Sequence, residues 1–233
     1  MIALTPDEWE VVRLSLKVSL VAVAAVTPVA FAIAYFLARA RVPGKLLIDA
    51  LVHLPLVLPP VVTGWLLLLG FGNNGPIGGW LNAHLGLSFM FRWTGAALAA
   101  AVMALPLMVR AMRLSIEAVD RRLESAARTL GAGRWRTFAT VTLPLSLPGV
   151  CAGLVLGFAR SIGEFGATIS FVSNIPGETR TLPLAIYAAL QVPGTDAQVF
   201  RLAAISVTLS LGALIASEWL ARRMGAGQGG HVL

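Results

Sequence analysis

Residues 14–37 read LSLKVSLVAVAAVTPVAFAIAYFL, an apolar run in which Lys17 is the only charged residue. A helix needs roughly 20 mainly apolar residues to cross about 30 Å of hydrocarbon, since each residue adds about 1.5 Å. This run is long enough, so it predicts a membrane-spanning helix. Further apolar runs of helix length make the predicted fold an all-α, polytopic membrane helix bundle with five spans. The other four spans are residues 50–71, 94–110, 147–172 and 202–220.

The composition also indicates a protein that is dissolved in lipid. Of 233 residues, 57% are hydrophobic and 12% charged, and the mean hydropathy is +0.81. The net charge of +7 would suggest nucleic-acid binding in a soluble protein. Here the charges lie between the apolar runs, so we expect no nucleic-acid partner and interpret the charge as positive-inside topology. Cys151 is the only cysteine, which excludes multi-Cys metal motifs, and we expect no metal site.

The loops predict an orientation, because Lys and Arg in short loops stay on the cytoplasmic side. Basic residues crowd residues 38–49, 111–143 and 221–223, whereas the N-terminal residues 5–10 are acidic. Five spans then place the N-terminus outside and the C-terminus in the cytoplasm, in a bacterial inner membrane. Residues 182–192 are apolar but too short to cross, and we expect a re-entrant or interfacial helix there. A sixth span over these residues is the alternative.

Residues 111–143 are the only sizeable segment outside lipid, and we expect them to form a cytoplasmic coupling loop within a single membrane domain covering 1–233. Residues 121–130 favour a helix, and the glycines at 131 and 133 are suited to its C-terminal end. A short amphipathic helix that ends in a tight turn is therefore predicted. The alternative is a solvated connector that lies on the lipid headgroups.

The segment 125–144 resembles the cytoplasmic motif of ABC importer permeases, E-A-A-x3-G-x9-I-x-L-P. One departure is that Ser125 stands at the motif's Glu, while Glu124 comes one residue early. The matching positions are Ala126, Ala127, Gly131, Leu143 and Pro144, with Val141 at the Ile position. The resemblance implies a helix that docks on a separate ATPase dimer, so that ATP is used by the partner and this chain has no cofactor. The docking residues that it implies are Glu124, Ser125, Ala126, Ala127, Gly131, Ala132, Arg134 and Trp135.

A second resemblance covers residues 158–183, with FARSIGEFGAT at 158–168 and NIPGETRTLP at 174–183, and it is joined by HLPLVLPP at 53–60. These stretches are similar to molybdate ABC transporter permeases, whereas sulfate permeases share only the Ala-Arg-x-x-Gly-Glu part. The family implies an ATP-driven importer that works by alternating access. It also implies a second copy of the chain, a periplasmic or extracellular oxyanion-binding protein and contact with lipid. Tungstate, sulfate and thiosulfate are the alternative substrates.

Two charges lie inside the predicted span 147–172. Arg160 and Glu164 are one helical turn apart, so they share a face and can pair. One interpretation is a structural ion pair. The other is a role in the translocation path or gate together with Thr168 and Ser170, where Glu164 would keep oxyanion binding weak. Small and hydroxyl residues in this region favour close helix packing over a pore lining.

Other classes of function are less consistent with the sequence. Gly44-Lys45 lacks the flanking residues of a phosphate-binding loop, and no catalytic triad or zinc-protease motif is present, so no catalytic residue is predicted. A secondary transporter or channel that uses Arg160 and Glu164 as an ion relay would predict inverted repeats, which are not visible. A membrane enzyme would need catalytic groups at one depth. Neither alternative explains the coupling motif.

Overall fold

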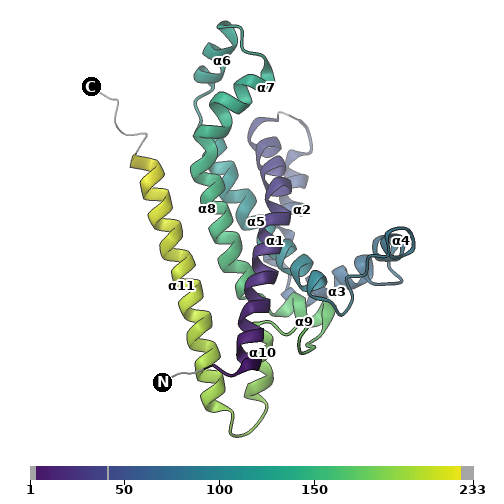
Figure 1. Ribbon diagram of the computed structural model, residues 1–233. Helices are drawn as coiled ribbons and strands as arrows, with labels where there is room; N and C mark the ends of the chain where they lie inside the picture. Colours follow the sequence, from purple (N-terminus) through teal and green to yellow (C-terminus); the bar gives the residue numbers. More distant parts are fainter. Residues whose placement is uncertain (1–3, 41, 227–233) are drawn as a thin grey trace.

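The computed structural model describes residues 4–40 and 42–226, and every regular element in this part of the chain is a helix. Four of these helices are long and apolar enough to cross a membrane, or five if the bent pair α2–α3 is one span. They form an elongated bundle with α6 at one end and α10 at the other (Figure 1). The elements are α1 (Pro6–Arg39), α2 (Lys45–Val57), α3 (Pro60–Phe71), α4 (Pro76–Leu85), α5 (Trp93–Ala118), α6 (Arg121–Thr129), α7 (Arg134–Thr137), the π-helical turn η1 (Phe138–Thr142), α8 (Leu143–Ile162), α9 (Gly166–Val172), α10 (Leu182–Leu190) and α11 (Asp196–Ala226).

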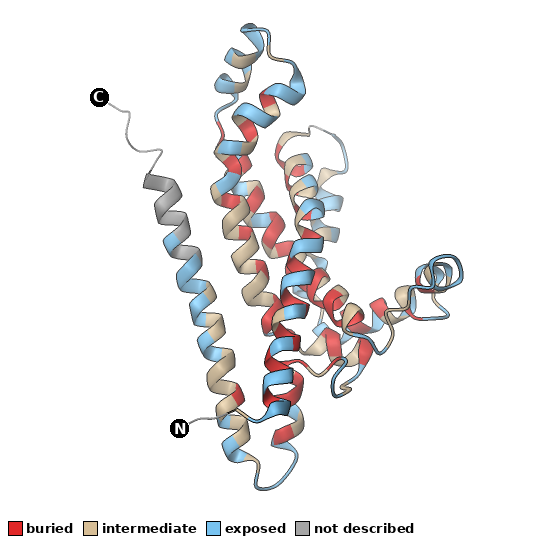
Figure 2. Ribbon diagram, in the orientation of Figure 1, coloured by how far each residue is buried: buried red, intermediate tan, exposed pale blue. Residues whose placement is uncertain are grey.

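The helix α1 contains the predicted span 14–37 and begins several residues earlier. Its start is a capping box, in which the Thr5 hydroxyl accepts from the Glu8 N–H at 3.3 Å and Glu8 Oε2 accepts from the Thr5 N–H at 2.8 Å. Such reciprocal bonds satisfy two N–H groups that a helix start leaves unpaired. The helix packs along α5, which is the central helix. Within the apolar 18-residue stretch of each helix, 67% of the residues of α5 are buried, compared with 6% of those of α11. Figure 2 shows that α11 is mostly partly buried or exposed.

The predicted single span over residues 50–71 is broken in the structure. α2 ends at Val57 and α3 begins at Pro60, and the two helix axes differ by 115°. Pro59 and Pro60 have no N–H to donate, and a residue before proline is forced out of the helical region. Leu58 is accordingly extended, with ψ at 144°. As a result α3 turns away from α2 toward α9, and α4 lies at the side of the bundle (Figure 1).

The predicted span over residues 147–172 also differs from the structure, because α8 ends at Ile162 and α9 begins at Gly166. At its other end α8 is longer than predicted, since α7, η1 and α8 form one apolar helical stretch from residue 134 to residue 162. The predicted coupling loop 111–143 is correspondingly shorter. Its first residues extend α5 to Ala118, and its last residues belong to the helical stretch that continues into α8.

The short apolar segment predicted over residues 182–192 forms α10, which ends at Leu190. With nine residues it is too short to cross a membrane. Its start is held to α1, because the Leu182 N–H donates to Ser15 Oγ at 2.6 Å. Leu182 and Ala185 are buried in a cluster with Val11 and Leu202. α10 therefore closes the end of the bundle opposite to α6.

Three glycines recur at every fourth position of α8 and lie against α5. A Cβ atom added to any of them would lie within 3.1 Å of an α5 side chain. Small residues in this pattern allow two membrane helices to approach closely. The pairs are Gly149 with Ser115, Gly153 with Met112 and Gly157 with Met108.

We expect Gly149→Ala to lower the thermal stability of the purified protein. The new methyl group would overlap the Ser115 Cβ and come within 2.9 Å of the Ala111 carbonyl oxygen, and overpacking of this kind costs about 1–3 kcal/mol. Gly212→Ala in α11 is the matched control, because no atom lies within 4 Å of its added Cβ. Thermal unfolding of both variants in detergent measures the difference. Equal unfolding temperatures would contradict the packing assigned to Gly149.

Candidate functional site

The helix α6 has a well-defined start and end. At the start, the Asp120 carboxylate accepts from the Arg122 N–H at 2.8 Å. At the end, Gly131 has a φ of +87°, and the Gly131 and Ala132 N–H groups donate at 3.0 Å to the carbonyls of Arg128 and Ala127. This is the Schellman arrangement, in which a left-handed glycine ends the helix. The predicted C-terminal cap at Gly131 is confirmed.

The helix α6 has no buried residue, and apolar side chains on and beside it are exposed. Leu130 and Trp135 are 89% and 85% exposed, and Leu123 is half exposed. An exposed apolar surface on a segment rich in charge is typical of a protein interface. Most of the residues implied in docking lie on this surface. Ser125, Ala126, Gly131, Arg134 and Trp135 are exposed, and Ala127 and Ala132 are partly exposed.

Glu124 differs from the other predicted docking residues, because it faces the bundle. Its Oε1 lies 2.8 Å from Arg39 Nη2, at the end of α1, and accepts from the Thr142 hydroxyl at 2.7 Å. Both side chains of the ion pair are largely buried, with 13% and 14% exposed. Ser125, at the motif's Glu position, only donates to the Arg121 carbonyl of its own helix. Glu124 therefore connects α6 to α1 and to η1.

We expect Glu124→Ala to destabilise the protein by about 1–3 kcal/mol, because Arg39 and Thr142 would lose their shared acceptor in a partly buried site. Limited proteolysis should also become faster between residues 119 and 133. Ser125→Ala is the matched control, since its hydroxyl makes only a bond within α6. Unfolding in detergent and the cleavage rate measure both effects. If the two variants behaved alike, Glu124 would not anchor α6.

The pairing of Arg160 and Glu164 is confirmed, with Arg160 Nη1 2.6 Å from Glu164 Oε2. The Glu164 side chain is 3% exposed and that of Arg160 is 25% exposed. The other Glu164 oxygen accepts from the Ala167 N–H at 2.8 Å. Glu164 thus joins the end of α8 to the start of α9, which supports the structural interpretation of the pair.

Thr168 and Ser170 lie on α9 where it packs against α3. Thr168 is buried, and the Ser170 hydroxyl donates to the Gly166 carbonyl at 2.9 Å. Across the interface, a Cβ added to Gly64 would lie 2.8 Å from the Ser170 Cβ and 2.5 Å from the Ala167 carbonyl oxygen. These distances favour close packing, as expected for small residues between membrane helices.

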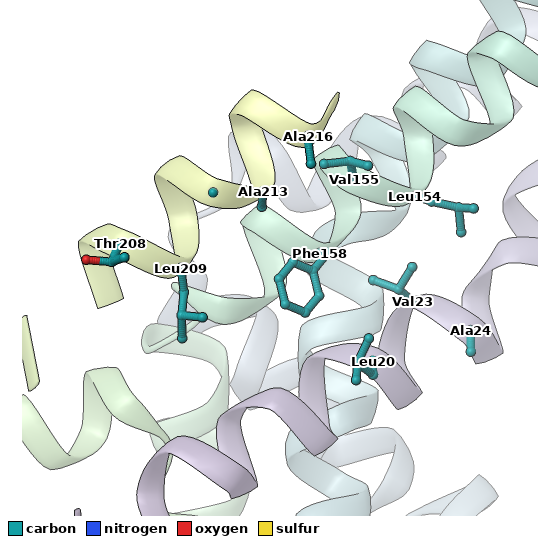
Figure 3. Close-up of a pocket in the computed structure, with 11 residues that line it drawn as sticks. Leu20, Val23, Ala24, Leu154, Val155, Phe158, Thr208, Leu209, Ala213 and Ala216 are labelled. Carbon is teal, nitrogen blue, oxygen red and sulfur yellow. The ribbon is translucent and has the colours of Figure 1, made fainter. Parts of the chain in front are cut away.

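A cavity of about 640 Å³ separates α11 from α1 and α8 (Figure 3). Thr208 is the one lining residue with a polar side chain, and its hydroxyl donates to the Ala204 carbonyl of its own helix. A cavity without hydrogen-bond donors cannot replace the hydration of an oxyanion. We therefore assign no ion to it. Its lining consists of Leu20, Val23, Ala24, Leu154, Val155, Phe158, Thr208, Leu209, Gly212, Ala213 and Ala216.

The ion pair between Glu8 and Arg201 was not predicted from the sequence. Arg201 Nη2 lies 2.7 Å from Glu8 Oε1, and Arg201 Nε donates to both carboxylate oxygens at 3.0 and 3.3 Å. The Glu8 side chain is 1% exposed. The pair holds the start of α11 to the start of α1. The only signal in the sequence is that Arg201 directly precedes the predicted span 202–220, where a long basic side chain can reach the interface or pair with an acidic group.

The sequence of this chain is similar to those of known membrane transport proteins. Residues 27–226 match the family described as binding-protein-dependent transport system inner membrane component. The chain belongs to this family. The permease is 59% identical over 219 residues to the molybdenum transport system permease protein ModB of Escherichia coli (strain K12). The aligned region covers 94% of this chain and 96% of ModB. It is 38% identical over 201 residues to the sulfate transport system permease protein CysT of the same strain, covering 85% of this chain and 71% of CysT.

Solved structures support the fold. One chain of a bacterial alginate ABC transporter matches this permease with a TM-score of 0.72 at 17% identity. The match covers 94% of this permease and 80% of that chain, whose structure was solved in complex with a periplasmic protein bound to an alginate pentasaccharide. The MetNI methionine ABC transporter matches with a TM-score of 0.66 at 15% identity, with 94% of each chain covered. The predictions of an all-α membrane permease and of a transport subunit in place of an enzyme are confirmed.

Proposed function

We propose that this permease is the membrane-spanning subunit of an ATP-driven importer of molybdate that works by alternating access. We infer the substrate from the sequence identity of 59% to the Escherichia coli molybdenum permease over 94% of the chain. The identity to the sulfate permease of the same strain is 38%. The GETRT stretch at residues 177–181 agrees with molybdate, as the sequence resemblance implies.

The proposed contact with the ATPase dimer is the exposed face of α6 together with Leu130 and Trp135. A helix with small alanines can enter a groove, and exposed aromatic and aliphatic side chains next to it can supply most of the binding energy. Glu124 and Arg39 connect this helix to α1, so a displacement of α6 by the ATPase would move the spans. The binding protein would dock at the other end of the bundle, near α10 (Figure 1).

We place the translocation path between two copies of the permease. The cavity beside α11 has an apolar lining, and the Arg160 guanidinium is already paired with Glu164. Neither location is therefore expected to bind an anion strongly. Weak binding is sufficient for a translocation path, because the ion must be able to leave it.

The N-terminal end of α1 and the α6 end lie at opposite ends of the bundle (Figure 1). With α6 in the cytoplasm, the N-terminus is outside.

The test is uptake into proteoliposomes that contain the permease, its ATPase and its binding protein. Radiolabelled molybdate, tungstate and sulfate are compared with and without ATP inside. We expect ATP-dependent uptake of molybdate, with tungstate as a competitor because the two ions have nearly the same size and charge. Sulfate in equal excess should compete far less.

Two results would change the proposal in different ways. Uptake of sulfate with little competition by molybdate would replace the substrate and leave the importer architecture intact. Uptake that continues without ATP or without the ATPase would contradict an ABC importer.

A further inference from the structure

A cleft of about 490 Å³ lies between the cytoplasmic part of α1 and the segment α7–η1. Three aromatic residues form its wall, with Phe138 placed edge-on to Phe31 at 6.0 Å and to Tyr35 at 5.3 Å between ring centroids. Trp135 extends this wall toward solvent, 6.4 Å from Phe138. The complete lining is Phe31, Ala32, Tyr35, Arg134, Trp135 and Phe138.

The cleft is apolar along α1 and positively charged at one end. Arg134 is exposed and makes no ion pair with any residue that the structure describes. The Tyr35 hydroxyl likewise has no hydrogen-bond partner within the described ranges 4–40 and 42–226. A ligand that is apolar over most of its length and anionic at one end would complement both features.

The depth of the cleft indicates where such a ligand comes from. Phe31 precedes Arg39 by about two turns of α1, which places it about 12 Å deeper in the membrane at 1.5 Å per residue. Tyr and Trp, which line this cleft as Tyr35 and Trp135, are typical of the level of lipid headgroups, and basic pockets between spans on the cytoplasmic side bind anionic lipid. The ATPase contact proposed for Trp135 concerns the solvent end of the cleft, whereas Phe31 and Ala32 line its deeper part on α1.

We propose that the cleft is a binding site for an anionic phospholipid of the cytoplasmic leaflet. The phosphate binds Arg134, the Tyr35 side chain lines the same cleft, and an acyl chain lies along Phe31, Ala32 and Phe138. Because α7 and η1 continue into α8, a lipid held here braces α1 against α8 next to the docking helix. The site is separate from the proposed path of the oxyanion, and its test does not depend on transport.

The experiment uses the full chain in phosphatidylcholine nanodiscs with a small fraction of phosphatidylglycerol that carries a photoactivatable acyl chain. We expect the crosslinks, mapped by mass spectrometry, to fall on residues 31–35 and 135–138. Arg134→Gln should reduce the yield about fivefold, as expected for loss of one cation near the membrane surface. Arg136→Gln is the matched control, since Arg136 is exposed two residues away and does not line the cleft.

A second pair of variants tests the cleft without changing charge. Ala32→Trp should fill the cleft and remove the crosslinks, whereas Val29→Trp, which adds the same group to an exposed position of α1 outside the lining, should retain them. Unlabelled phosphatidylglycerol should compete, and inorganic phosphate at the same concentration should not.

Four results would overturn the site. Equal labelling by photoactivatable phosphatidylcholine, or equal effects of Arg134→Gln and Arg136→Gln, would show that no anionic lipid is selected. Competition by inorganic phosphate would assign Arg134 to a free anion. If addition of the ATPase displaced the lipid and Arg134→Gln weakened ATPase binding to the same extent, the cleft would belong to the ATPase interface.

Discussion

Gly131→Val is expected to reduce ATP-driven uptake by the assembled transporter about tenfold or more, with the permease still folded and inserted. Gly131 has a φ of +87°, which a β-branched residue adopts only under strain, at a cost of at least about 1–2 kcal/mol. The change would open the bonds from the Gly131 and Ala132 N–H groups that end α6. Leu130 would then be displaced from the proposed docking surface. Uptake into proteoliposomes and co-purification of the ATPase measure the effect.

Gly133→Val provides a control of the same size and chemistry only two residues away. Gly133 has a φ of −66°, and neither glycine has an atom within 4 Å of an added Cβ. Steric crowding is therefore equal for the two variants, and backbone conformation is what separates them. We expect Gly133→Val to retain most of the uptake. A loss as large as that of Gly131→Val would indicate that bulk in this segment, and not the left-handed turn, is what matters.

Glu8→Ala is expected to produce the largest loss of stability, because it leaves Arg201 without its carboxylate at a site where Glu8 itself is 1% exposed. Removing one partner of a buried ion pair typically costs about 3–5 kcal/mol. The same change removes the acceptor of the Thr5 N–H, which begins α1. Unfolding of the purified permease in detergent measures the cost, and cysteine crosslinking between α1 and α11 reports whether α11 separates.

A double-mutant cycle distinguishes the ion pair from the capping role of Glu8. Arg201→Met alone should also destabilise the protein, because it leaves a buried carboxylate. The double variant Glu8→Ala with Arg201→Met should cost less than the sum of the two single variants, since no charge is then left unpaired. Additive costs would mean that the 2.7 Å contact contributes no coupling, and that Glu8 acts only through the cap.

The sequence was most informative where a feature depends on neighbouring residues. The apolar run at 14–37 is long enough for a span whatever surrounds it, and α1 contains it. Thr5 and Asp120 begin helices and Gly131 ends one through bonds that reach only a few residues along the chain. The match to the coupling motif is likewise a matter of local spacing, so the sequence is sufficient to locate the candidate docking helix.

The breaks within the predicted spans could be anticipated only in part. Pro59 and Pro60 indicate that helical bonds are lost, but the direction of the 115° bend depends on how α3 packs against α9. The end of α8 at Ile162 has a weaker signal, because only Arg160, Gly163 and Glu164 interrupt a stretch that is otherwise apolar enough for one span. Glu164 stabilises this break by accepting from the Ala167 N–H.

Hydropathy and helix capping act within a few residues. For this reason the class of protein, the apolar stretches able to span the membrane and the position of the candidate docking helix all follow from the sequence. The packing of distant segments, in contrast, brings Glu124 to Arg39, brings Arg201 to Glu8 across 193 positions, and places Phe31 and Phe138 in one cleft. Contacts of this second kind depend on the angles and rotations at which helices pack. These angles follow from close packing along whole helix faces, as with the glycines of α8 against α5, and no single stretch of sequence contains that information.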